Sequence, residues 1–104
     1  MNLISRTLPP SSTGPSAAIG LDWMRVPFAA TVSVYTTGAC SLGMEFTLDD
    51  LMTTPPGNVR WQPSAEIPTG TTASKTVQLL TPYTGIRLNV ASNAAAIEWR
   101  VAQG

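Results

Sequence analysis

Apolar and polar residues alternate along most of this chain, and the pattern is clearest near the C-terminal end. In residues 86–90, Ile, Leu and Val alternate with Arg and Asn, and in residues 97–101, Ile, Trp and Val alternate with Glu and Arg. A period of two is typical of a strand with one buried face and one solvated face. The pattern therefore predicts two strands here, separated by an Ala-rich bend.

If these two strands form a hairpin, their apolar faces must lie on the same side of one sheet. The register that pairs Leu88 with Ile97 puts Arg87 opposite Glu98. The register that pairs Leu88 with Trp99 puts two arginines opposite each other, which is unfavourable. The sequence therefore predicts a hairpin in which Arg87 faces Glu98.

Similar segments extend back to the start of the chain. Residues 1–8 resemble a strand that ends at two prolines, and further strands are expected within residues 17–26, 30–36, 42–48 and 76–79. Six to eight short strands separated by Gly and Pro are typical of an antiparallel β-sandwich or barrel. We predict an all-β protein: a single small antiparallel β-sandwich or partly open barrel with a long Pro-rich loop. It forms one domain over residues 1–104, in which residues 1–10 are an N-terminal arm or the first strand.

Trp23 and Trp99 lie in phase with apolar neighbours, and we expect both rings in the core. Cys40 is the only cysteine, and we expect it to be buried as a small apolar residue.

The longest irregular region, residues 49–68, contains four prolines. Loops of this length in a compact domain usually carry function or contacts. Trp61 follows Arg60 within it, and these residue types are common at the centre of protein interfaces. Our interface candidates are Asn58, Arg60, Trp61 and Tyr83. The alternative for Trp61 is that it folds back and closes an open end of the sandwich.

Composition favours a protein that works in contact with others. Charged residues make up 12% of the chain, against a usual share of about 25%, and the formal net charge is zero. Weak electrostatic self-repulsion favours association, so we expect a homo-oligomer. The chain has no basic surplus for binding nucleic acid and no apolar run long enough to cross a membrane. Its first residues lack the features of a signal peptide, so we expect synthesis in the cytoplasm.

Few residues are suited to chemistry. The chain has no histidine, which removes the commonest general base and metal ligand. Asp49 and Asp50 with Glu45 nearby are the best candidates for a calcium site, but neighbouring strand residues point to opposite faces, and an Asx-capped turn is the simpler interpretation. Glu45 with Glu98 is the only candidate for a glycosidase-like acid pair. We predict no catalytic residue, no metal and no cofactor, and therefore no enzyme.

Four segments in residues 44–104 resemble small virion proteins of tailed bacteriophages. They are MEFTLDD (44–50), the loop residue Trp61, TGIRLNV (84–90) and the terminal WRVAQG (99–104). The chain departs from that pattern at residues 93–96, where Ala-rich sequence replaces the expected Gly and Thr. The resemblance implies a non-enzymatic structural protein of a phage particle.

From these observations we expect a capsid decoration or cement protein that binds the lattice of the major capsid protein, or other virion proteins. It would be located in the virion after assembly in the host cytoplasm. A tail or head-to-tail connector protein is the first alternative. The second, from another class, is a carbohydrate-binding or adhesin module that uses Trp61 and Tyr83 as sugar platforms.

Overall fold

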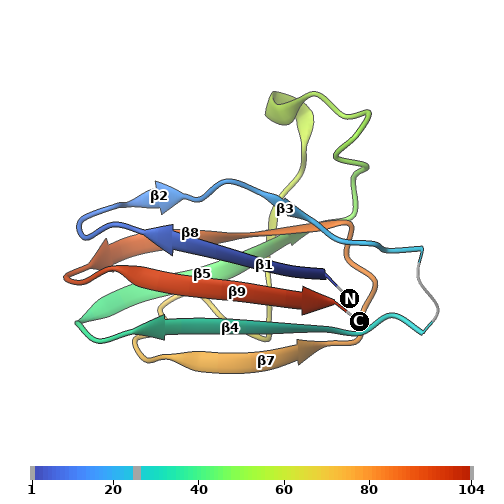
Figure 1. The fold of residues 1–104 in the computed structure, drawn as a ribbon. Helices are drawn as coiled ribbons and strands as arrows, with labels where there is room; N and C mark the ends of the chain where they lie inside the picture. The colour runs from blue at the N-terminus through green and yellow to red at the C-terminus, as the bar shows by residue number, and fades with distance from the viewer. Residues whose placement is uncertain (1, 25–26, 104) are drawn as a thin grey trace.

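The protein is a sandwich of two antiparallel β-sheets, as the strand spacing predicts (Figure 1). The computed structural model describes residues 2–24 and 27–103, so Met1 of the predicted first strand and residues 25–26 of the predicted segment 17–26 lie outside the described part. The first sheet has four strands in the order β1-β9-β4-β7, and the second has five, in the order β2-β8-β5-β6 with β3 also paired to β8. The strand bounds are β1 Asn2–Leu8, β2 Gly14–Pro15, β3 Ile19–Gly20, β4 Ala30–Thr36, β5 Cys40–Thr47, β6 Gln62–Pro63, β7 Lys75–Leu79, β8 Gly85–Asn93 and β9 Ile97–Gln103.

From β4 onward, the longer strands alternate between the two sheets, and this corrects the predicted C-terminal hairpin. β8 belongs to the second sheet and β9 to the first, so Arg87 does not face Glu98. Glu45 of β5 lies opposite Arg87 instead. The apolar side chains of β8 and β9 are buried because they face each other across the interior from opposite sheets. The alternation of residues alone does not distinguish this arrangement from a hairpin.

The Ala-rich bend departs from a hairpin turn because it crosses between the layers. A second crossing, from β4 to β5, lies against it: the amide of Ala94 donates to the carbonyl of Ala39 at 2.8 Å. A Cβ on Gly38 would lie 2.7 Å from the Cβ of Ala95. Two crossings packed this closely require small residues on both sides.

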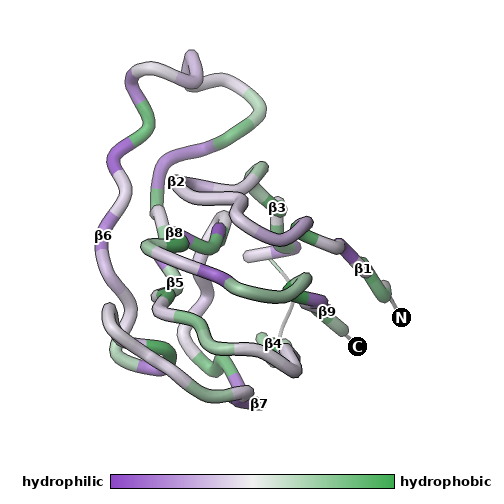
Figure 2. Tube along the Cα trace, turned by 90° about the vertical axis from the view of Figure 1, so that its left-hand side faces the viewer, coloured by the Kyte–Doolittle hydropathy of each residue, from purple (hydrophilic) through white to green (hydrophobic). Residues whose placement is uncertain are grey.

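Figure 2 shows apolar residues on the strands of both sheets. The core lies between these sheets, at the inward positions of the strands. Trp99 is 0% exposed, as predicted, and Cys40 is also buried. The other core residues are Ile19, Leu21, Ala30, Val32, Val34, Leu42, Met44, Ile67, Leu79, Tyr83, Ile86, Leu88, Val90, Ile97 and Val101.

Trp23 is not in the core, and that prediction is wrong. Its side chain is 44% exposed, although Ile19 and Leu21 before it are buried as expected. The strand ends at Gly20, and the amide of Trp23 bonds back to the carbonyl of Leu21 at 3.0 Å. This tight turn breaks the alternation, so the phase of the strand does not continue to the indole.

The second half of the predicted loop is more regular than its prolines suggest. Residues 62–71 run beside β5: Gln62 and Pro63 pair with it as β6, and Met44 donates to the carbonyl of Ile67 at 2.9 Å. Because a proline lacks an amide hydrogen, such a segment is suited to the edge of a sheet. The irregular part of the region is therefore residues 48–61, which rise away from the sandwich (Figure 1).

Candidate functional site: a groove beneath the 48–61 loop

The 48–61 loop leaves the end of β5 and returns at β6, and its two ends are fastened together. The backbone amide of Arg60 donates to Oδ2 of Asp49 at 2.7 Å, and the Arg60 guanidinium donates to Oδ1 at 3.1 Å. These hydrogen bonds hold the pKa of Asp49 below its ordinary value of 3.8. A compact loop whose ends meet in this way is a common carrier of function.

The loop is also anchored to the sandwich. The Thr84 hydroxyl donates to the backbone carbonyls of Thr47 and Asp49, at 2.9 and 2.6 Å. The carbonyl of Asp50 accepts from the amide of Thr54 at 2.8 Å, and a short 3-10 helix, η1 (Pro56–Asn58), turns the chain back. Since prolines fix the backbone angle φ, this loop has little conformational freedom to lose when it binds a partner.

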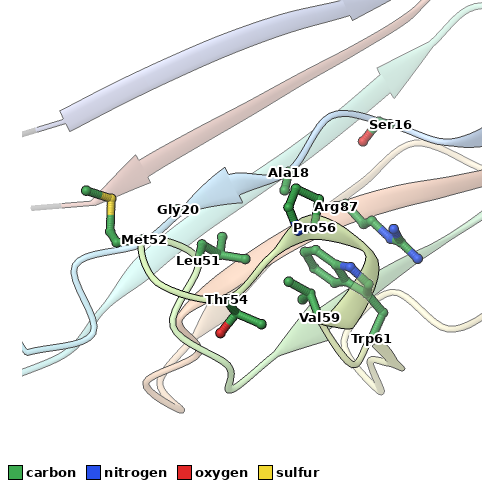
Figure 3. Close-up of a pocket in the computed structure, with 10 residues that line it drawn as sticks. All are labelled: Ser16, Ala18, Gly20, Leu51, Met52, Thr54, Pro56, Val59, Trp61 and Arg87. Carbon is green, nitrogen blue, oxygen red and sulfur yellow. The ribbon is translucent and has the colours of Figure 1, made fainter.

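Between this loop and the β2–β3 segment lies a groove of about 500 Å³ over the outer face of β8. Figure 3 shows Trp61 and Val59 on the loop side of the groove, and Ala18 and Gly20 on the β2–β3 side. A volume of this order is usual for a binding cleft. The full set of lining residues is Ser16, Ala18, Gly20, Leu51, Met52, Thr54, Pro56, Val59, Trp61 and Arg87.

Arg87 and Trp61 form the most specific contact in the groove. The guanidinium of Arg87 lies 4.4 Å from the centroid of the Trp61 ring (Figure 3), a favourable cation–π geometry. Nε of Arg87 also donates to Glu45 on β5 at 2.8 Å. Trp61 is half-buried on the outer face of the second sheet, so it does not close an end of the sandwich.

The loop also exposes apolar side chains around the groove. Met52 is 92% exposed, and Leu51 sits above Gly85, where an added Cβ would lie 2.5 Å from Cδ1 of Leu51. The absence of a side chain at Gly85 therefore allows the loop to approach β8 closely. Methionine adapts its shape to different partners and is common at binding surfaces.

The four predicted interface residues do not form one site. Trp61 lines the groove, whereas Arg60 turns away from it to Asp49, and Asn58 is exposed in η1. Tyr83 is only 7% exposed, so its ring is not placed for a surface contact or a sugar platform. It stacks on Phe46 with centroids 4.2 Å apart.

The Tyr83 hydroxyl is held in the interior by a carboxylate. It donates to Oε1 of Glu66 at 2.8 Å. Burial, and then the Glu66 contact, raise the pKa of Tyr83 to about 12. Tyr83 thus ties the segment beside β5 to the core.

The groove residues that sequence reasoning missed are Arg87, Leu51, Met52, Val59 and the small residues of the β2–β3 segment. Arg87 was assigned to a hairpin pair with Glu98, although its outward position on the strand was read correctly. An apolar pair, Leu51 and Met52, inside a polar and Pro-rich loop is the signal that points to the site.

The acidic residues have separate partners. Asp49 binds Arg60, Asp50 accepts from the amide of Met52 at 2.9 Å, and Glu45 binds Arg87. Glu98 lies on β9, in the other sheet from Glu45. In residues 2–24 and 27–103, no three His, Cys, Asp or Glu side chains gather where a metal ion would bind.

Comparisons with known proteins leave the family open. No family model matches the chain, and no curated protein matches it. Among solved structures, the chain is similar to a de novo designed double-stranded β-helix determined by solution NMR. That likeness has a TM-score of 0.40 and 10% sequence identity over 100% of both chains. Within the described residues, none of the helical structure is long and apolar enough to span a bilayer.

Proposed function

We propose that this chain is a non-enzymatic structural protein of a phage particle that acts by binding another virion protein through the groove. Its position in the particle is on the capsid, where it binds the lattice of the major capsid protein as a decoration protein. The residues that support this proposal are those that build the groove and fasten its loop.

The observation that carries the proposal is where the resembling segments meet. MEFTLDD contributes Glu45 and Asp49, the loop contributes Trp61, and TGIRLNV contributes Arg87. Glu45 bonds Arg87, which lies against Trp61, and Asp49 fastens the loop that carries the indole. Three of the four segments that resemble virion proteins therefore converge on this groove, whereas Trp99 of the terminal segment lies in the core.

The groove has the properties of a preorganised protein contact. Its walls are mainly apolar, and the 48–61 loop that covers it is stiffened by Pro55 and Pro56. The Asp49 carboxylate holds the two ends of this loop together. An apolar segment of a partner would fill it and cover Trp61 without first ordering the loop, which improves affinity for a given area. Aromatic and Arg side chains at the centre of such a patch commonly carry most of the binding energy.

The guanidinium of Arg87 gives this contact a polar element. Among the hydrogen bonds of the described residues, only its Nε has a protein acceptor. Its terminal N–H groups are donors for a backbone carbonyl or carboxylate of the partner. Such a donor beside an apolar groove would fix the direction in which the partner segment lies.

Quantitative mass spectrometry of purified particles tests the proposal, using a phage whose genome encodes this chain. A decoration protein is expected at hundreds of copies, scaled to the major capsid protein. About a dozen copies would indicate a ring at the tail or connector. Absence from the particle would overturn the proposal, and glycan binding lost in Trp61→Ala would then favour the carbohydrate-binding module.

A further inference from the structure

The edges of the two sheets differ in how they are protected. The second sheet ends in strands of two residues each, β2 with Pro15 and β6 with Pro63. The first sheet ends in β7, which begins with exposed Lys75, and in β1, which is seven residues long. Prolines, charged side chains and short length are the usual means of preventing edge-to-edge pairing. β1 is long and contains no proline, and Arg6 is its only charged residue.

The outer edge of β1 is open along its length. Within the described residues, the backbone ladder of β1 runs only to β9, from Asn2 opposite Gln103 to Leu8 opposite Ile97. Leu3 is 65% exposed, and Ser5 and Thr7 on the same face are also exposed. A strand with these features presents unpaired amides and carbonyls that are suited to another strand.

We infer that β1 pairs antiparallel with β1 of a second copy of this chain, which joins the two four-stranded sheets edge to edge. A two-fold axis perpendicular to the sheet keeps the outer faces of both copies on one side. Residues that face outward must then lie opposite residues that face outward, so the axis passes through a residue position. This condition leaves few registers.

The axis at Ser5 is selected by both strand length and charge. It is the central residue of Asn2–Leu8, so only this register overlaps the whole of both strands. It places Leu3 opposite Thr7 of the second copy, and Arg6 opposite Ile4. An axis one position later would put two Arg6 side chains face to face, which is unfavourable.

This inference does not rest on the proposed function. β1 lies at the edge of the first sheet, whereas the groove lies over the outer face of β8 in the second. Figure 2 shows β1 on the opposite side of the molecule from β6 and the return of the 48–61 loop. The β1 edge and the outer face of β8 thus belong to different sheets, and the two claims can fail separately.

Disulfide trapping tests the register. Directly opposite residues in an antiparallel pair have Cα atoms about 4.5 to 5.5 Å apart, within the range that a disulfide spans. Ser5→Cys is therefore expected to form a covalent dimer under mild oxidation. Thr76→Cys is the matched control, because Ser5, Arg100, Ser33 and Thr76 form one row across the sheet and Thr76 lies on its opposite edge. Native Cys40 is buried and does not compete.

Sedimentation equilibrium of Ser5→Glu provides a second readout. In the folded chain the new carboxylate faces Arg100, so the fold is preserved, but in the dimer two carboxylates meet at the axis. We expect the dimer Kd to rise about fivefold, and Thr76→Glu to leave it unchanged. Equal cross-linking at both edges, no cross-linking at Ser5, or a native chain that stays monomeric at the highest concentration would each overturn the inference.

Discussion

The indole of Trp99 gives the sharpest test of the fold, because it is both fully buried and polar. Its side chain is 0% exposed, between Arg6 on β1 and Val34 on β4, and it faces the interior. Replacing a buried aromatic residue with alanine usually costs about 3 to 5 kcal/mol. A domain of this size has a total stability of about 5 to 15 kcal/mol, so Trp99→Ala is expected to lose a large share of it.

The indole nitrogen predicts a different result for Trp99→Phe. Among the described residues, Nε1 of Trp99 has no hydrogen-bond partner. A buried donor without a partner costs about 1 to 3 kcal/mol, and phenylalanine removes that donor while it keeps one ring. The loss of volume and the removal of the donor oppose each other, so Trp99→Phe should cost only about 1 kcal/mol.

Urea unfolding followed by far-UV circular dichroism measures both effects without relying on tryptophan fluorescence. With a slope of about 2 kcal/mol per molar, Trp99→Ala should lower the midpoint by about 2 M, and Trp99→Phe by about 0.5 M. Lys75→Ala, on an exposed position of β7, should change stability by less than about 0.5 kcal/mol. Equal losses for Trp99→Ala and Trp99→Phe would refute the reasoning about the indole donor, and a midpoint for Trp99→Ala equal to that of Lys75→Ala would refute the burial itself.

Three further predictions concern the loop and its supports. The pKa of Asp49 lies below 3.8 because of its hydrogen bonds from Arg60, so the contact between the two loop ends is stable above that pH and is lost as the pH falls through the folded pKa. The fluorescence of Trp61 in the loop should report this opening, and Asp49→Ala should show it already at neutral pH. The pKa of Tyr83 is raised to about 12, so the contribution of its protonated hydroxyl to stability is complete below pH 10 and is lost as the pH rises toward 12. In an alkaline titration followed by difference absorbance, the phenol ionisation at the highest pH should be missing from Tyr83→Phe. A Cβ on Gly43 would lie 2.8 Å from the backbone of Thr69, so Gly43→Ala should lower the free energy of unfolding by about 1 to 3 kcal/mol, as measured by thermal unfolding. Gly57→Ala is the control: its Cβ meets open space, so stability should hardly change.

Local alternation was enough to predict the six longer strands and most of the core, but not the two-residue strands β2 and β6. Ile97, Trp99 and Val101 are buried in the phase that the pattern indicates, and β1 ends at the predicted prolines. These outcomes follow because a period of two determines which side chains share a face. The same rule failed at Trp23, where a tight turn interrupts the strand.

Which sheet a strand joins is not encoded in its alternation. β8 and β9 satisfy their apolar faces across the interior as well as they would within one sheet, so the Arg87–Glu98 pair was a reasonable prediction with the wrong topology. The Ala-rich bend lacks the Gly and Thr expected of a hairpin turn, but this departure was not interpreted as a crossing between sheets. Its reason, the close approach of Gly38 to Ala95, appears only in three dimensions.

The candidate site was predicted in part. The loop was identified from its length, and Trp61 from the frequency of tryptophan at the centre of protein interfaces. The partners of Trp61 were not, since Arg87 and Ala18 lie far from it in the sequence and reach it only when the loop folds over β8. Tyr83 was predicted to lie at an interface but is buried. It lies in the turn before β8, where strand alternation does not determine which way a side chain points.

We propose that Trp61 and the groove around it make the contact with a virion protein. The most direct test measures occupancy of the Trp61→Ala variant on particles that lack the native protein, with Trp23→Ala as the control at an exposed tryptophan outside the groove. We expect both variants to remain folded by circular dichroism. Apparent affinity should fall at least about tenfold for Trp61→Ala, about 1.4 kcal/mol, and stay near native for Trp23→Ala. Full occupancy by a folded Trp61→Ala would contradict this proposal and place the contact on another surface.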